Sequence, residues 1–398
     1  MRPQLPGRST TPLSSRRRTS LRELALLYLK LGTTAMGGPA AHIAMMEEEV
    51  VDRRRWLTRE EFLDFLGAAN VIPGPSSTEM AIHVGRVHAG WPGLVVAGVS
   101  FILPASLMVG SLAWAYVRFG ALPRIAASLY GVKPVVIVVI AQGAIRLARS
   151  AIKSTGLAVL GAMSVLAAAL GLDALFTLFA AGVVAGCVHL ARKLRNRPST
   201  VAAAAGAVSA AAGVAAPFRL GLMSLVFLKI GATLFGGGYV LVAFLRSDFV
   251  ARLHWLSEQQ LLDAVAVGQV TPGPLFTTAT FIGYVLGGPA GAVLATIAIF
   301  LPAFVFVALS GPLVGWLRRS NLAGAVLDGI NVAAIALMIV VSAQLARTAV
   351  VDGFTLGIAA VSALLLFRYR VNSTWLVVGA AVAGELVTWL GLPALGRR

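Results

Sequence analysis

Hydrophobic and polar positions in this chain alternate on the scale of whole helices. Apolar runs separated by short polar segments predict spans near residues 22–46, 91–117, 132–149, 155–171 and 173–191, and again near 218–245, 288–314, 329–349, 353–367 and 373–391. An α-helix needs roughly 20 such residues to cross a hydrocarbon core about 30 Å thick. The pattern predicts an all-α polytopic membrane protein of about 10 to 13 spans.

The second half of the chain repeats the first. Lys30, Trp56 and Pro73 recur 199 positions later as Lys229, Trp255 and Pro272, and Gly85 recurs 198 positions later as Gly283. Two homologous halves of this kind are typical of secondary transporters. We expect a disordered basic cytoplasmic tail at 1–20, a first repeat at 21–191, a basic loop with an Ala-rich linker or extra span at 192–216, a second repeat at 217–391 and a tail at 392–398.

Each half also contains a broken element, near residues 59–88 and 257–285. Thr58 with Glu61, and Ser257 with Gln260, have the spacing of capping boxes that start a helix. Pro-Gly-Pro at 73–75 and 272–274 then ends it. Helices of about 13 residues reach only about 20 Å, which predicts a hairpin or discontinuous helix that ends inside the membrane. The alternative is a tight turn between helices that lie on the membrane surface.

Composition supports the membrane class. Apolar residues make up 58% of the chain and charged residues 12%, whereas soluble domains have roughly 45–50% and about 25%. The net charge of +17 comes from short Lys/Arg clusters between apolar runs, which favours the positive-inside rule over nucleic-acid binding. We expect a multi-pass protein of the plasma or inner membrane, surrounded by lipid, with a cytoplasmic N-terminus and no nucleic-acid partner.

The relative orientation of the halves depends on residues 200–216. If the basic segments at the N-terminus and at 192–197 are both cytoplasmic, the first half crosses an even number of times. The Ala-rich stretch must then cross as well for the second half to be inverted. We favour inverted halves over parallel ones.

The broken elements supply the candidate anion site. A helix N-terminus at membrane depth presents unpaired N–H groups and a partial positive charge, so one such terminus per half can converge on a small oxyanion. Lys30 and Lys229 lie in the first span of each half, where they either bind the anion or extend to the interface. The candidate binding residues are Lys30, Lys229, Gly37, Gly38, Gly236, Gly237, Asn70, Gln269, Pro73, Gly74, Pro75, Ser76, Ser77, Thr78, Pro272, Gly273, Pro274, Thr277 and Thr278.

Three acids are candidates for carrying protons. Asp64 and Asp263 occupy matching positions, and Glu79 follows the first turn without an acidic counterpart. Neither the five histidines nor the single Cys187 has metal-ligand spacing. We expect no metal, no cofactor and no catalytic residue.

These motifs together resemble the long-chain chromate ion transporter family. The resemblance rests on Gly37-Gly38-Pro39-Ala40-Ala41-His42, on Phe235-Gly236-Gly237-Gly238-Tyr239, on the Trp56-Leu57-Thr58 and Trp255-Leu256-Ser257 starts, and on both Pro-Gly-Pro turns, and it covers about 22–390. It implies an antiporter that exports chromate, driven by the proton gradient, and confers resistance. It also implies competition by sulfate. Lys133-Pro134 faces Asn331-Val332 in the repeat, a departure that argues against a symmetric site.

The sequence hypothesis is alternating access, with the dianion held by Ser76, Ser77, Thr277 and Thr278 hydroxyls, backbone N–H groups and both lysines. A transporter of sulfate or another oxyanion with the same architecture fits equally well. A membrane-embedded enzyme is the third class, for which we find no catalytic constellation. A homodimer stays open.

Overall fold

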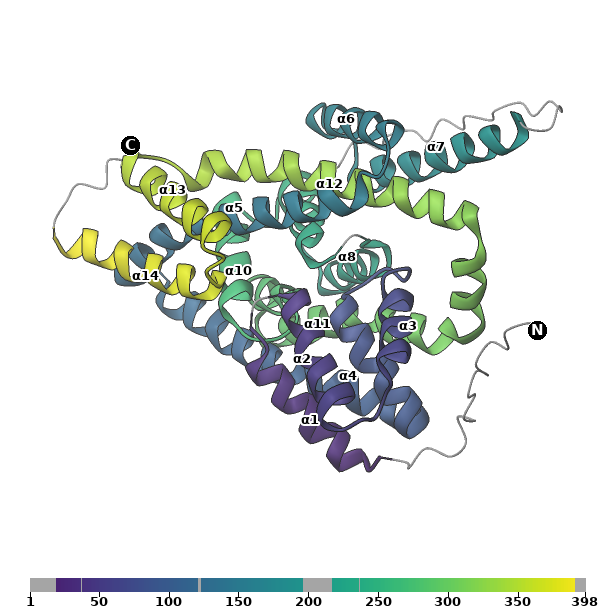
Figure 1. Ribbon diagram of the computed structural model, residues 1–398. Helices are drawn as coiled ribbons and strands as arrows, with labels where there is room; N and C mark the ends of the chain where they lie inside the picture. The colour runs from purple at the N-terminus through teal and green to yellow at the C-terminus, as the bar shows by residue number, and fades with distance from the viewer. Residues whose placement is uncertain (1–18, 37, 121–122, 196–216, 236, 391–398) are drawn as a thin grey trace, which may run out of the picture.

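The computed structural model describes residues 19–36, 38–120, 123–195, 217–235 and 237–390, and within these ranges it contains helices and no strand (Figure 1). The first half contains α1 (Leu21–Thr34), α2 (Pro39–Glu47), η2 (Glu48–Arg53), α3 (Arg59–Ala69), α4 (Ser76–Phe119), α5 (Pro123–Ala151), α6 (Thr155–Ala169) and α7 (Ala174–Arg195). The second half contains α8 (Leu220–Thr233), η3 (Gly238–Val240), α9 (Leu241–Leu245), η4 (Arg246–Arg252), α10 (Glu258–Val270), η5 (Leu275–Thr277), α11 (Thr278–Arg319), α12 (Asn321–Ala349), α13 (Gly353–Arg368) and α14 (Ser373–Trp389).

The described helices confirm an all-α polytopic architecture. Five of them, in α4, α5, α7, α11 and α12, are long and apolar enough to cross a membrane. Four shorter apolar helices, α6, α8, α13 and α14, accompany them. The predicted tails and the Ala-rich stretch at 200–216 lie outside the described residues.

The first element of each half is interrupted, so the single spans predicted at 22–46 and 218–245 are wrong. α1 ends at Thr34, and α2 begins at Pro39 after an extended segment with Gly38 at φ 80°. The second half breaks at the same place, with Gly237 at φ 99°. Hydropathy cannot detect such a break because the apolar run continues through it, whereas glycine tolerates the left-handed backbone that ends the helix.

The first broken element is a helical hairpin, as the sequence predicted. α3 begins at its Thr58–Glu61 capping box, and the chain then reverses at the turn 73–75. The His83 ring stacks on Phe65 at 5.7 Å between centroids, and His88 contacts Trp56, so the two arms are antiparallel. We call residues 59–88 the first hairpin.

α4 is two helices joined by a second reversal. Ala89 and Gly90 have non-helical dihedral angles, and the Gly85 and Gly93 backbones are in direct contact across the bend. The second half repeats this bend at Gly287–Gly288, where the hydroxyls of Thr280 and Thr296 are 2.7 Å apart. We call residues 258–286 the second hairpin.

Equivalent helices of the two halves pack antiparallel. Lys153, just beyond the end of α5, pairs with Asp328 near the start of α12 at 2.8 Å, and Tyr130 near the start of α5 donates a hydrogen bond to Asp352 just beyond the end of α12. A pseudo-twofold axis therefore lies perpendicular to these helices. When both helices cross a membrane, this axis relates inverted halves, the arrangement that the sequence favoured.

The last two helices of each half pack against the other half. Figure 1 shows α13 and α14 beside α5, while α6 and α7 lie along α12. Glycines allow these contacts: Gly131 of α5 meets the Ala380 carbonyl of α14, and Gly329 of α12 meets the Ala181 carbonyl of α7. The two halves are therefore interlocked, because the C-terminal helices of each half pack against the long helix α5 or α12 of the other.

Candidate functional site

The tips of the two hairpins dock into each other's halves. The Gly74 N–H donates a hydrogen bond to the Leu234 carbonyl at 2.9 Å, and the Gly273 N–H donates to the Ala35 carbonyl at 2.9 Å. Ala35 and Leu234 are the C-caps of α1 and α8, the first residues of the two helix breaks. Each turn therefore donates an N–H group to the C-cap carbonyl of α1 or α8, which has no hydrogen-bond partner within that helix.

Only glycine fits at the centre of each turn. Gly74 and Gly273 have φ values of 140° and 97°, in the region that residues with a Cβ rarely adopt. A Cβ at Gly273 would also lie 2.6 Å from Cβ of Ala105. The flanking prolines limit the turn to one backbone geometry. The sequence therefore specifies a narrow, rigid tip that can enter a helix break.

A small cavity lies where the second tip meets the first helix break. Its volume is ≈ 10 Å³, about the room of one water. We call it the central cavity, and its lining residues are Gly38, Pro39, His42, Tyr239, Gly268, Gln269, Thr271, Gly273 and Leu275. None of these lining residues is Lys or Arg. Gln269 Nε2 is buried without a hydrogen-bond partner, so the lining offers an unused donor.

The structure places the predicted hydroxyls in different environments. Ser77 Oγ lies 3.4 Å from His42 Nδ1, next to the central cavity, and Thr78 Oγ1 is buried without a partner. Ser76 is half-buried. Thr277 and Thr278 each donate to a backbone carbonyl of their own turn at 2.8 Å. The hydroxyl groups of Thr277 and Thr278 in the second hairpin therefore already donate to backbone carbonyls. In the first hairpin, Ser77 contacts a histidine ring and Thr78 has no partner.

Glu79 is fully buried directly behind the first turn. Its carboxylate lies against Gly74, and neither oxygen has a hydrogen-bond partner. His83, one helical turn further on, is also buried and has an unpartnered Nε2. The second hairpin has threonines at the positions aligned with Glu79, so this acidic group belongs to one half only.

The matched acids Asp64 and Asp263 differ. Asp64 is exposed on α3, whereas Asp263 on α10 is buried. Asp263 Oδ1 lies 3.2 Å from Lys133 Nζ, and the Tyr116 hydroxyl donates to Oδ2 at 3.0 Å. Sequence reasoning did not select Lys133 or Tyr116. The replacement of Lys133 by Asn331 in the repeat was the available signal.

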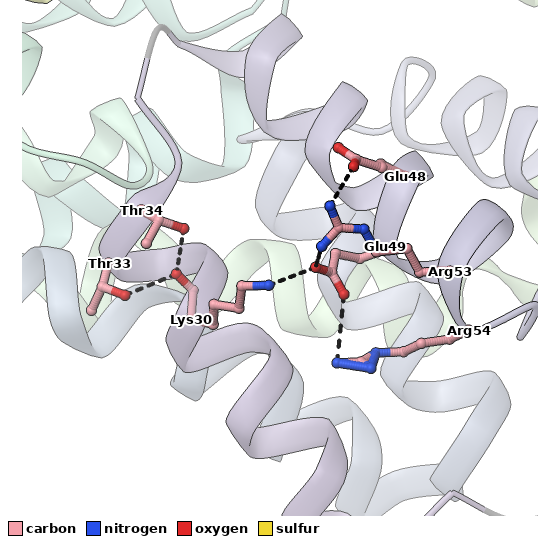
Figure 2. A network of polar contacts seen from close by, with 7 residues as sticks. All are labelled: Lys30, Thr33, Thr34, Glu48, Glu49, Arg53 and Arg54. Carbon is pink, nitrogen blue, oxygen red and sulfur yellow. Dashed lines mark hydrogen bonds and ion pairs between the residues drawn. The ribbon is translucent and has the colours of Figure 1, made fainter.

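Both candidate lysines form ion pairs inside their own halves (Figure 2 for Lys30). Lys30 Nζ lies 2.7 Å from Glu49, and Lys229 Nζ lies 2.6 Å from Asp248. Arg53 and Arg252 reinforce the two acids from matching positions. The hydrogen bond from Lys30 lowers the pKa of Glu49, which lies on η2 outside the candidate spans.

Each lysine thus ties α1 or α8 to the π-helix that follows, and neither lines the central cavity. Of the other candidates, Asn70 is exposed at the end of α3, and Gly37 and Gly236 lie outside the described residues. Among the described residues, no group of three His, Cys, Asp or Glu side chains is placed to hold a metal ion.

Comparison with known proteins gives a consistent result. The chromate transporter family model matches residues 22–188 and again 221–385. A chromate transport protein of Cupriavidus metallidurans is 35% identical over 374 residues, 92% of each chain. One of Pseudomonas aeruginosa is 33% identical over 388 residues, covering 94% of this chain and 93% of that protein. A probable chromate transport protein of Synechococcus elongatus is 31% identical over 377 residues, covering 92% and 95%.

No solved structure matches the chain. The family model covers both halves separately, in agreement with the internal repeat and with the matching helix breaks and hairpins. The chain therefore belongs to the chromate transporter family, a family of multi-pass membrane transporters and not of enzymes.

Proposed function

We propose that this protein exports chromate by alternating access between its two halves, uses the proton gradient as the driving force, and so confers chromate resistance. The observation that carries the proposal is the reciprocal docking of the hairpin tips, from Gly74 to Leu234 and from Gly273 to Ala35. A site assembled from both halves is exposed to either side when the halves rock against each other.

The central cavity is our candidate for the oxyanion site. It lies at the uncapped N-terminus of α2, whose N-cap Gly38 supplies no side-chain hydrogen bond. Gln269 and His42 line it, and Ser77 adjoins it through His42. A tetrahedral oxyanion has five heavy atoms, so the tips must part to admit it. Binding and opening are then the same movement.

Glu79 is our candidate for the proton carrier. Burying an ionised carboxylate without a partner costs several kcal/mol, so Glu79 is protonated while the tips are closed on each other. Without bound anion, the hairpin tips then close only when Glu79 is protonated. The conformational change that returns the empty transporter carries that proton across the membrane. His83 is placed one helical turn away to relay it.

We further propose that the protein resides in the cell membrane with its N-terminus in the cytoplasm. Lys153 and the end of α5 share a face of the bundle with the start of α12. The sequence adds Arg146 and Arg149 just before this face and Arg192 at the end of α7, an excess that the positive-inside rule assigns to the cytoplasm.

Everted membrane vesicles test the proposal. We expect chromate to accumulate in vesicles that carry this chain, and a collapsed pH gradient to stop accumulation. Vesicles with His42→Ala and Gln269→Ala together should accumulate far less chromate at equal protein abundance. Equal accumulation with and without the chain would contradict export.

Sulfate is the second candidate cargo, because it is a tetrahedral dianion and the proposed donors recognise that shape and charge. Unlabelled sulfate in the same assay decides between them. Sulfate that inhibits chromate uptake and is itself accumulated at least as fast would make this protein a sulfate transporter of the same build.

A further inference from the structure

A large cavity lies beside the first hairpin, at the end of the bundle where α12 begins. This cavity of ≈ 490 Å³ extends from the first two turns of α12 and from His189 on α7 to Val71, two residues before Pro73. Its lining includes Asn321, which is exposed, and Asp328. We call it the side cavity. It connects the first hairpin tip to the face on which Lys153 pairs with Asp328.

A buried charged cluster lies toward the opposite face. Lys133 on α5, Asp263 on α10 and Tyr116 on α4 meet there, and we call them the far-face cluster. Tyr116 lies near the end of α4, and Lys133 lies three turns into α5. α5 begins at the face opposite the one where it ends beside α12, so the cluster and the side cavity belong to opposite sides of the hairpin tips.

The cluster joins the halves directly. Lys133 and Tyr116 come from the first half, and both contact the Asp263 carboxylate of the second. The Lys133 and Asp263 side chains are 16% and 6% exposed. Asp263 Oδ1 lies within ion-pair distance of Lys133 but makes no well-directed hydrogen bond. The attraction within a buried ion pair of this kind is only slightly larger than the free energy needed to desolvate the two charges. The pair can therefore hold the two halves together and still separate at a small cost in free energy.

The pseudo-twofold axis predicts a matching cluster beside the side cavity, and the sequence has not kept one. Lys133 corresponds to Asn331, and Tyr116 to Val314. Asp263 corresponds to Asp64, which is exposed. An ion pair equivalent to Lys133–Asp263 cannot form with a neutral asparagine. The far face therefore has a buried ion pair between the halves whose counterpart is lost on the cavity side, where the ion pair between the halves, Lys153–Asp328, is partly exposed.

We propose that Lys133, Asp263 and Tyr116 form the gate that closes the passage on the face away from the side cavity, and that their separation is a required step of transport. The inference rests on the proposed alternating access. It assigns Asp263 to the gate, and Glu79 remains the candidate proton carrier. The open side is then the one that the basic segments mark as cytoplasmic.

A cysteine reporter tests the gate without chromate. In a Cys187→Ser background, Thr271→Cys places one thiol on the lining of the central cavity, where Thr271 is 9% exposed. A membrane-impermeant maleimide is applied to right-side-out and to everted vesicles. We expect Lys133→Met to raise labelling from the far face at least about fivefold, the lower end of the effect of removing a coupling between two states.

Two further variants make the test specific. Lys133→Asp with Asp263→Lys restores a charge pair of the opposite sense and should return far-face labelling toward the parent level. Lys153→Met is the matched control, because it breaks a different ion pair between the two halves, Lys153–Asp328 on the cavity side, and should leave far-face labelling unchanged. Tyr116→Phe removes only the hydroxyl and should give a smaller increase than Lys133→Met.

Unchanged labelling in Lys133→Met, at normal abundance, would overturn the gate. So would a charge-reversed pair that labels as strongly as the single variant. If Lys133→Met is not inserted, Asp263→Asn and Tyr116→Phe decide by the same readout. A chain that shows the labelling shift but transports no chromate keeps the gate and loses the proposed cargo, so the two failures are distinguishable.

Discussion

The two hairpins share one backbone plan and carry different chemistry. Both start at a capping box, turn at Pro-Gly-Pro and donate a glycine N–H to the helix break of the other half. The first then buries Glu79 without a partner, whereas the second fills that place with threonines bonded to their own turn. The first lies beside the side cavity, and the second is tied to the far-face cluster. Duplication preserved the geometry that docks the tips, while each copy kept a different set of polar groups.

The largest expected effect concerns Glu79. Glu79→Gln keeps the neutral form that the closed tips require but cannot release a proton. We expect gradient-driven chromate accumulation to fall more than about tenfold, while chromate–chromate exchange without a gradient persists. Flux measurements in everted vesicles with and without a pH gradient check both. Asp64→Asn, an exposed acid on the same hairpin, is the control and should retain accumulation.

The next effect concerns the fit of the tips. Gly273→Ala places a methyl group 2.6 Å from Cβ of Ala105, in addition to a strained φ of 97°. We expect a loss of about 2–4 kcal/mol of stability. Gly288→Ala also has a positive φ, 62°, but nothing within 4 Å, so it should lose only the cost of the strained backbone, about 1–3 kcal/mol. Thermal unfolding in detergent compares them, and equal losses would show that docking adds no constraint.

An intermediate effect on the KM for chromate distinguishes α10 from α3, the two helices that lead into the turns. Gln269→Leu removes the buried, unpartnered amide of the central cavity, and we expect the KM for chromate to rise about tenfold. Asn70 occupies the matching position on α3 but is exposed. Asn70→Leu should change KM less than about twofold. The reverse order would move the oxyanion site to the first hairpin.

A smaller effect compares the two lysine clamps. Lys229 is 30% exposed beside an Asp248 that keeps one other cation, Arg252. Lys30 is 52% exposed beside a Glu49 that keeps both Arg53 and Arg54. We expect Lys229→Met to cost about 1–3 kcal/mol of stability and Lys30→Met below about 1 kcal/mol. Chromate uptake normalised to folded protein should stay near the parent level, and a selective loss of uptake would return the lysines to the binding site.

The smallest effect is a dependence on pH. Lys30 lowers the pKa of Glu49, so the ion pair stabilises the fold above the ordinary carboxyl pKa and loses that contribution as pH falls through the lowered value. Lys30→Met should therefore be less sensitive to acid than the parent, by a few tenths of a kcal/mol, because solvent around the half-exposed lysine screens the pair. Unfolding followed from neutral pH to below about pH 4 checks the difference.

Several features of the fold were predictable because they depend on local sequence. The capping boxes at Thr58 and Ser257 start α3 and α10, and the prolines of both turns stop the helices, since caps and missing donors act within one helical turn. The breaks at Gly38 and Gly237 were not predicted as breaks. Their flanks are as apolar as the helices, and a glycine shows its backbone angle only once the chain is folded.

The sequence by itself determined the class of the protein, its duplication and the position of both Pro-Gly-Pro turns, because composition, register and proline chemistry are properties of the chain alone. Only the tertiary structure decided that each turn enters the opposite half, that Lys30 and Lys229 are paired to their own acids, and that Lys133 meets Asp263. These contacts join residues up to 238 positions apart, from Ala35 to Gly273. Their formation depends on how interlocked helices bring donors, acceptors and charges together, which no local pattern encodes.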